Sequence, residues 1–372
     1  MGIAGILILF LLAISVTSFL LISPQFGDSP TKAEQQYYSK LSYYNDGIFE
    51  NLMPTEMSMS FSKILSILKD YAAGIPNQKP QQPLNVVRHS AIPSKSPDSR
   101  GQLIWFGHSA FFLQMNNINI LIDPMFGESP SPVPFFGSKR FTEGLPVLID
   151  SLPSIDLVLI SHDHYDHLDY PTIKKISSKV ATFFVPLGVA AHLRSWGIPD
   201  SKIREFQWWE EVNYSGITVA SAPARHFSGR GLTDRFETLW CSWVIKSKEL
   251  SVYFSGDGGY GGHFEEIGRR FGPFDIAMME CGQYDERWKE IHMMPEETAQ
   301  AAKDVSAEAF MPVHWGAFVL ALHSWDDPVK RVIKAAKPMN IEVLTPQIGE
   351  IVQLPLSKSL SNPSWWQDPK YH

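Results

Sequence analysis

Three histidines and an aspartate lie within six residues, directly after an apolar run that has the character of a buried strand. The apolar run is Leu157–Ile160, and the polar residues are His162, His164, Asp166 and His167. Packing in a core explains a single histidine, but not a cluster this dense. Neutral imidazoles and carboxylates are ligands that Zn²⁺ prefers. The first two histidines can share one side of a turn while the other two residues point elsewhere, so the cluster favours two metals.

Two metals need more ligands, and three further candidates each follow another strand-like run. They are His226, Asp257 and His314. Each alone has an ordinary explanation, such as a turn, a cap or a core imidazole. Together they complete three ligands per metal and one bridging carboxylate.

Short apolar runs and helical patterns alternate along much of the chain from Gly101, which predicts a mixed α/β fold. The predicted strands are Leu103–Phe106, Ile118–Ile122, Leu157–Ile160, Thr182–Val185, Ile217–Ala220, Trp240–Ile245, Val252–Phe254, Ile276–Met279, Phe310–Val313 and Ile341–Leu344. The predicted helices are Pro171–Ser177, Gly188–Ser195, Phe264–Phe271, Pro295–Val305 and Asp327–Ala336.

The N-terminal segment carries no charged side chain before Asp28, and Ile3–Ile22 is apolar apart from a few small or hydroxyl residues. Twenty helical residues span about 30 Å, the thickness of the hydrocarbon core of a bilayer. We therefore predict a single-pass membrane anchor over residues 1–23, with a cleaved signal peptide as the alternative. Lys32 and Lys40 follow the segment and no Lys or Arg precedes it, which leans toward a cytoplasmic catalytic domain.

Residues 24–100 are rich in proline and are predicted to form a connecting arm. Within it, Phe61–Tyr71 has helical spacing with its apolar residues on one side. This helix is expected to pack on the main domain, and resting on a membrane surface is the alternative. The main domain is predicted over 101–355, with a C-terminal tail over 356–372.

Composition excludes some functions. Lys+Arg number 32 and Asp+Glu number 39, giving a net charge of −7, which argues against general nucleic-acid binding. The two cysteines, Cys241 and Cys281, cannot form a disulfide framework and are expected to be buried thiols.

The His-x-His-x-Asp-His run with the three later ligands resembles the metallo-β-lactamase superfamily. Within it, the chain is similar to the N-acylphosphatidylethanolamine-hydrolysing phospholipase D group and its bacterial relatives. The stretches that carry the likeness are Trp105–Ser109, Ser161–Tyr170, Phe184–Gly188, Trp208–Glu210, Phe264–Gly268, Arg270–Asp275, His292–Glu297 and His314–Phe318. The stretch Met279–Cys281, and Asp285 after Tyr284, depart from the phospholipase pattern.

The resemblance implies a four-layer αβ/βα sandwich with two Zn²⁺ per chain at one edge. One zinc would be held by His162, His164 and His226, the other by Asp166, His167 and His314, with Asp257 bridging. The implied activity is hydrolysis of an N-acylphosphatidylethanolamine-like phospholipid by a bridging hydroxide. A lactonase or sugar-phosphate lactonase is the alternative. The presence of His164 in place of Glu disfavours flavodiiron chemistry, and the absence of a Cys ligand disfavours antibiotic hydrolysis.

Beyond the ligands, His292 and Asp166 are the predicted catalytic residues, and His292 and Tyr165 are predicted to contact the substrate. His292 is not needed as a ligand, so we expect it to contact the phosphate or to act as the general acid. The alternative is that His292 only makes a contact at the N-terminus of the following helix. The expected partners are a phosphodiester or phospholipid substrate and a membrane, without nucleic acid. Whether the chain forms a homodimer is left open.

Overall fold

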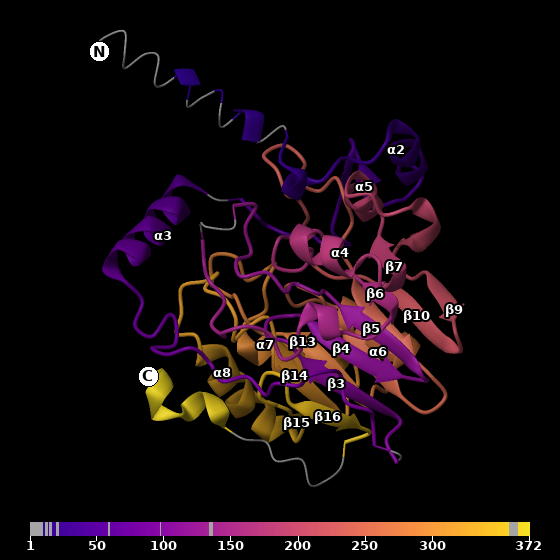
Figure 1. Ribbon diagram of the computed structural model, residues 1–372. Coiled ribbons are helices and arrows are strands. Elements are labelled where there is room, and N and C mark those ends of the chain that lie inside the picture. The colour runs from indigo at the N-terminus through magenta and orange to yellow at the C-terminus, as the bar shows by residue number, and fades with distance from the viewer. Residues whose placement is uncertain are drawn as a thin grey trace.

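The structure is a computed structural model, and it describes residues 10–11, 14, 17–19, 22–58, 60–96, 98–133, 137–356 and 364–372. The main body consists of two seven-stranded sheets flanked by helices (Figure 1). A two-stranded ribbon, β1 (Tyr44–Asn45) with β2 (Ile48–Phe49), lies in the preceding arm.

The first sheet has the strand order β16-β3-β4-β5-β6-β7-β8. Its strands are β16 (Ile351–Leu354), β3 (Gly101–Trp105), β4 (Phe111–Met115), β5 (Ile118–Ile122), β6 (Ile155–Leu159), β7 (Val180–Pro186) and β8 (Ile203–Phe206). Pairs from β16 to β5 are antiparallel, and pairs from β5 to β8 are parallel.

The second sheet has the order β15-β14-β13-β12-β11-β10-β9. Its strands are β15 (Glu342–Val343), β14 (Ala309–Val313), β13 (Ile276–Glu280), β12 (Ser251–Phe254), β11 (Ser242–Lys246), β10 (Ile217–Ala222) and β9 (Glu211–Tyr214). Strands β12 to β15 are parallel and β9 to β12 are antiparallel.

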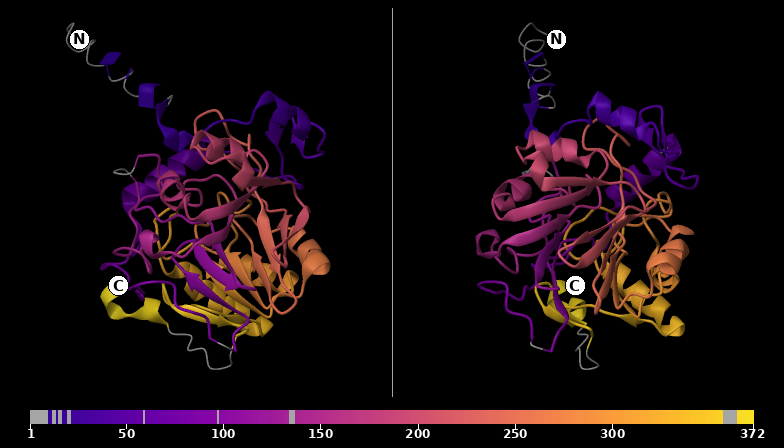
Figure 2. Two further views of the ribbon diagram at one scale, coloured as in Figure 1. Left: turned by 45° about the vertical axis from the view of Figure 1, so that its right-hand side comes forward. Right: turned by 90° about the vertical axis from the view of Figure 1, so that its right-hand side faces the viewer.

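Alternation along the strands builds three apolar layers. In β6, Leu157 and Leu159 point into the core shared by the two sheets, whereas Val158 points to the outer face. Helices α4 (Tyr170–Ile176) and α5 (Val189–Ser195) cover that outer face. Helices α6 (His263–Phe271), α7 (Pro295–Asp304) and α8 (Asp327–Ala336) cover the outer face of the second sheet. Figure 2 shows the resulting order of helices, sheet, sheet and helices.

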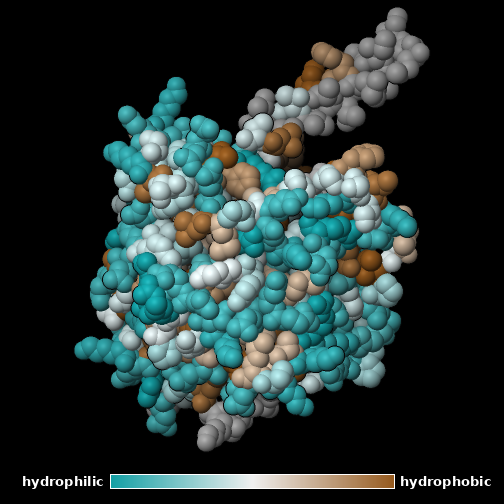
Figure 3. All heavy atoms as spheres, turned by 180° about the vertical axis from the view of Figure 1, so that it is seen from behind, coloured by the Kyte–Doolittle hydropathy of each residue, from teal (hydrophilic) through white to brown (hydrophobic). Residues whose placement is uncertain are grey.

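Both flanks of the main domain pack against it. Tyr38 at the end of α2 (Lys32–Tyr38), Phe49 and Leu84 are buried in the core between the sheets. Near the C-terminus, the Trp365 ring stacks on Trp315 at 5.5 Å between centroids. On the face seen in Figure 3, apolar side chains occur in small separate groups on a mostly hydrophilic surface.

The predicted mixed α/β fold with two large sheets is confirmed. The ten strand predictions and the five helix predictions of the main domain each coincide with an observed element. Strands β4, β8, β9 and β16 were not predicted. For β8 and β9 the reason is physical: they carry exposed or half-buried residues, so they lack the continuous apolar run of a buried strand.

The predicted membrane anchor is wrong. Within the described residues, none of the helices combines the length and the apolar character needed to span a bilayer. The apolar helix α3 (Phe61–Ala73) has 13 residues, or about 20 Å, against the roughly 30 Å required. Most of the segment on which the prediction rested, residues 1–9, 12–13, 15–16 and 20–21, lies outside the described part.

Helix α3 forms where its spacing predicted it, but it does not pack through its apolar side. None of its residues is buried, and Phe61, Leu65 and Leu68 are all more than half exposed. Its contacts with the domain include polar ones: Arg287 donates to Asp70 at 2.8 Å and to Ser66 at 3.0 Å.

Candidate metal centre

The predicted ligands come together at one edge of the sandwich, where strands from both sheets end. The segment His162–His167 follows β6 of the first sheet, whereas His226, Asp257 and His314 follow β10, β12 and β14 of the second. His162, His167 and the three later residues are all buried. Ligands 152 positions apart in the sequence therefore meet because the two sheets face each other.

Three imidazoles, His162, His164 and His226, form the first group of side chains that could hold a metal. His164 Nδ1 lies 3.0 Å from His162 Nε2 and 3.3 Å from His226 Nε2. Burial, with the neighbouring imidazoles, holds the pKa values of His162 and His226 well below the ordinary value. These rings are therefore neutral at physiological pH, as metal ligation requires.

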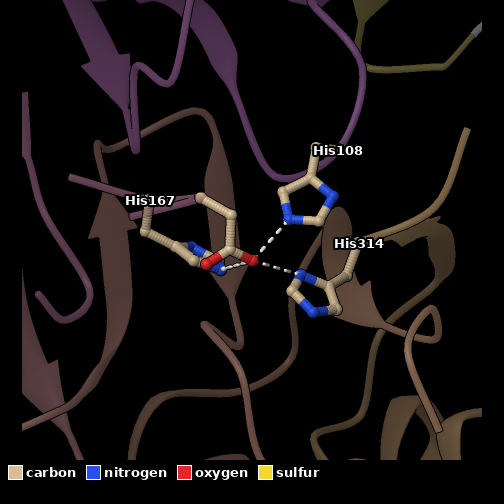
Figure 4. Close-up of side chains that lie close together, drawn as sticks. His108, His167 and His314 are labelled. Atoms are coloured by element: carbon tan, nitrogen blue, oxygen red, sulfur yellow. Dashed lines mark hydrogen bonds and ion pairs between the residues drawn. The ribbon is translucent and has the colours of Figure 1, made fainter. Parts of the chain in front are cut away.

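The second group surrounds one oxygen of Asp166. Its Oδ2 lies 2.8 Å from His108 Nε2, 3.4 Å from His167 Nε2 and 3.9 Å from His314 Nδ1. Figure 4 shows the three rings converging on a single carboxylate. Burial alone would raise the pKa of Asp166, but His167 and His108 outweigh it and hold that pKa well below its usual range.

Asp257 lies between the two groups. Its Oδ2 is 3.9 Å from both His162 Nε2 and His226 Nε2, and 3.1 Å from His167 Nε2. Its Oδ1 is 3.2 Å from His314 Nδ1, yet it has no hydrogen-bond partner in the described structure although it is buried. A buried carboxylate oxygen without a hydrogen bond is costly, and a cation at this point would remove the cost.

The tautomers of three ligands also suit a cation. His226 Nδ1 donates to the Ile291 carbonyl oxygen at 2.9 Å, and His167 Nδ1 donates to Asp123 Oδ2 at 2.7 Å. His162 Nδ1 lies 2.9 Å from the Ser161 hydroxyl, which itself donates to Asp123. In their neutral forms, with Nδ1 protonated, these rings leave the Nε2 lone pair facing Asp257 and its neighbours. The donor set therefore fits the binding of divalent metal.

Sequence reasoning missed two residues that position these ligands. Asp123 organises both His167 and Ser161, and its only signal was its place directly after the predicted strand Ile118–Ile122. Asn51, in the arm, donates to the His226 carbonyl oxygen at 2.8 Å and accepts from the His226 N–H at 3.1 Å. A lone asparagine 175 residues from its partner gives no signal in the sequence.

Three site residues have left-handed backbones. The φ angles of His108, Asp123 and His314 are 56°, 39° and 68°. Such angles strain residues other than glycine and are found where the surrounding structure fixes them. The peptide from Gly282 packs directly against His314 and is one such constraint.

Adding a methyl group at Gly282 is therefore expected to damage the site. A Cβ there would lie 1.5 Å from the His314 carbonyl oxygen and 2.2 Å from its carbonyl carbon, so the backbone must shift. We expect Gly282→Ala to lower the free energy of unfolding by about 1–3 kcal/mol and to reduce bound metal. The measurements are urea unfolding and metal analysis. Gly262→Ala is the control, because a Cβ there meets nothing within 4 Å and φ is −66°; equal effects in the two variants would contradict the expectation.

His292 lies beside the two groups without belonging to the predicted ligand set. Its ring centroid is 5.1 Å from that of His226 and 5.3 Å from that of His314. Its Nδ1 faces Glu280 Oε1 at 3.2 Å. Burial lowers the pKa of His292, but the hydrogen bond to Glu280 and its negative charge outweigh burial and raise it.

A cavity of about 520 Å³ opens over the cluster, and its lining includes His164, Asp166, Asp257, His292 and His314. This places His292 and the junction between the two groups at one surface that a substrate can reach.

Tyr165, unlike His292, lines a different cavity from the one over the metal ligands. Its hydroxyl donates to the Arg230 carbonyl oxygen at 2.7 Å, and it lines a second cavity of about 630 Å³. Its contact with substrate stays a prediction. Two other acidic residues of this segment are hydrogen-bonded to neighbouring groups: Asp163 to Gly229, Thr238 and His192, and Asp169 to the start of α4.

Fold and site together define a class. Residues 118–315 match the family model described as the beta-lactamase superfamily domain, so the chain belongs to that superfamily. It is 31% identical over 264 residues to N-acyl-phosphatidylethanolamine-hydrolyzing phospholipase D 1 of Caenorhabditis elegans, covering 66% of this chain and 74% of the relative. The resemblance seen in the motifs is thereby confirmed.

Two further matches extend the comparison. An uncharacterised protein of Mycobacterium tuberculosis is 39% identical over 335 residues, which is 87% of each chain. Among solved structures, a metallo hydrolase from the archaeon Ignicoccus hospitalis aligns with a TM-score of 0.51 at 23% identity, covering 68% of this chain and 97% of that one. The structural match shows the fold alone. The family and the buried donor set together support a metal-binding hydrolase.

Proposed function

We propose that the chain is a dinuclear zinc phosphodiesterase that hydrolyses N-acylphosphatidylethanolamine-like phospholipids in the manner of a phospholipase D. The observation that carries the proposal is the position of Asp257, whose two oxygens face both groups of ligands at the base of one cavity. The activity named for the C. elegans relative supplies the substrate class.

The residues divide into two metal sites. His162, His164 and His226 would hold one zinc, and Asp166, His167 and His314 the other, with Asp257 shared. His108 is a positioning residue, because it donates to the Asp166 oxygen that the second group surrounds. When bound, two zinc ions supply Lewis acidity toward phosphoryl oxygens and activate water at neutral pH.

The remaining chemistry belongs to the chain. Water adds to phosphorus, the bond from phosphorus to the ester oxygen of the head group breaks, and that oxygen needs a proton as it departs. His292 lines the cavity beside both groups, and although burial lowers its pKa, the hydrogen bond to Glu280 outweighs burial and raises it. It is the proposed donor of that proton.

Metal analysis gives the first test. We expect about two Zn²⁺ per chain after gentle purification, because two complete donor sets are present. Chelators should remove the metal and the activity together, and added Zn²⁺ should restore both. A single iron per chain, or redox activity with oxygen, would contradict the assignment.

The substrate is tested with a panel on the purified full-length chain. Detergent-dispersed N-acylphosphatidylethanolamine should yield phosphatidic acid and an N-acylethanolamine, while lactones should stay closed. The variant His162→Ala serves as the inactive control for contaminating phospholipase. Lactone opening without phosphodiester cleavage would support the lactonase alternative and overturn the proposal.

A further inference from the structure

The stretch Met279–Cys281 departs from the phospholipase pattern, and its central residue touches His292. We propose that Glu280 is a positioning residue for His292, fixing its ring so that Nδ1 is committed to the carboxylate and Nε2 is left for the leaving group. This inference rests on the proposed role of His292 and adds a residue that the ligand set does not contain.

The carboxylate of Glu280 is rigidly placed at the end of β13. Its side chain is fully buried. Its backbone N–H donates to the Ser255 hydroxyl at 2.8 Å, and its carbonyl oxygen accepts from the Thr298 hydroxyl at 2.8 Å. These bonds connect Glu280 to the end of β12 and to α7, so the side chain starts from a fixed point.

The two carboxylate oxygens match two donors on consecutive residues. Oε1 faces His292 Nδ1 at 3.2 Å, and Oε2 accepts from the Met293 N–H at 2.9 Å. One side chain thus holds both the ring of His292 and the backbone that follows it. Only a carboxylate can do so without turning, because an amide offers one acceptor and would aim its NH₂ group at a donor.

The pairing is also electrostatic. A buried carboxylate needs a positively charged or strongly donating neighbour, and the groups that stabilise ionised Glu280 are His292 and the Met293 N–H. Burial raises the pKa of Glu280 to about 7 in spite of them. In return, a proton on Nδ1 fixes the tautomer of His292, the arrangement by which a carboxylate orients a catalytic imidazole.

Neighbouring rings complete the placement. His314 lies nearly parallel to His292, with 15° between the ring planes, and His226 lies across it at 71°. Rotation of the His292 ring is therefore limited on these sides, and the contact between its Nδ1 and Glu280 sets its angle. No residue of this arrangement other than His292 needs to touch the substrate.

The test is Glu280→Gln in the full-length chain, assayed on two diesters with different leaving groups. For the lipid, whose alkoxide needs a proton, we expect kcat to fall about 10- to 100-fold with little change in KM. For a nitrophenyl phosphodiester, which leaves without a proton, we expect less than about a threefold change. Zinc content should stay at two. In a His292→Ala background, Glu280→Gln should have no further effect, because the residue it positions is gone.

A matched control and a second variant separate the positioning role of Glu280 from a general effect on folding. Glu297→Gln makes the same change at a carboxylate whose Oε2 accepts from the Met294 N–H, away from His292, and it should behave as the unaltered chain. If Glu280→Gln fails to fold, Glu280→Asp keeps two acceptors and should show a smaller loss with the same bias toward the lipid. Equal losses on both diesters, or an undiminished loss in the His292→Ala background, would overturn the inference.

Failure of the proposed function is a separate outcome. It would be seen in the unaltered chain, as absence of lipid hydrolysis. The comparison of good and poor leaving groups could then be repeated on whichever phosphodiesters or esters that chain does cleave, so Glu280 would still be tested.

Discussion

Replacing Asp257 by asparagine is expected to remove bound metal and turnover together. The substitution keeps the shape of the side chain but deletes the negative charge that faces both ligand groups. Without that charge, the repulsion between two divalent cations held by the neighbouring ligand groups would be less well compensated. We expect metal content to fall below two per chain, and kcat/KM to fall by at least the roughly 10²–10³-fold that loss of one electrostatic stabiliser costs.

The matched control is Asp169→Asn. Asp169 is also a buried aspartate of the same region, but it accepts from Thr172 at the start of α4, a position that asparagine fills almost equally well. Both variants are measured by metal analysis and steady-state kinetics. Full metal content in Asp257→Asn, with activity near that of the control, would remove Asp257 from the centre of the site.

Replacing His292 by alanine is expected to leave both metals in place and to slow the lipid reaction by about 10²–10⁴-fold, the usual contribution of one proton-transfer group. A nitrophenyl phosphodiester should be affected far less, because its leaving group departs without a proton. Kinetics on both substrates and metal analysis of the same preparation are the measurements.

The other outcomes for His292→Ala each have a distinct meaning. Equal losses on both substrates at full metal content would mean that His292 binds the phosphate and does not donate a proton. Loss of metal would place His292 among the ligands, a reading compatible with its position beside His226 and Asp257. No loss on either substrate would reduce it to a contact at the start of α7.

The metal ligands could be predicted because they either lie close together in the sequence or come directly after a clearly apolar strand. His162–His167 stands out by density alone, and His226, Asp257 and His314 each follow an apolar run that does form a strand. The residues that position these ligands or His292 are not marked in the sequence by any such cluster. Asp123, Asn51 and Glu280 are single polar residues whose partners lie 38, 175 and 12 positions away, and only folding brings them together.

Most of the fold could also be predicted from apolar runs, and the elements that were missed show where this approach fails. Most of the buried strands contain continuous apolar runs and were predicted, although the buried strand β4 was not. The edge strand β9 alternates between exposed and half-buried residues and was also missed. Helix α3 has the spacing of an amphipathic helix, yet spacing does not tell whether a partner surface exists, and its apolar residues are exposed.

The two hydrogen bonds between Asn51 and His226 make the arm and the metal centre thermodynamically linked. If docking of the arm favours the ligand arrangement that binds metal, then bound metal must favour docking of the arm by the same free energy. Resistance of residues 24–58 to proteolysis should therefore rise with zinc concentration, although none of them is a ligand. A change at Asn51 should reduce this coupling, so that the effect of zinc on arm docking and the effect of arm docking on zinc binding fall together. The state of the arm would then report on metal loading without any substrate.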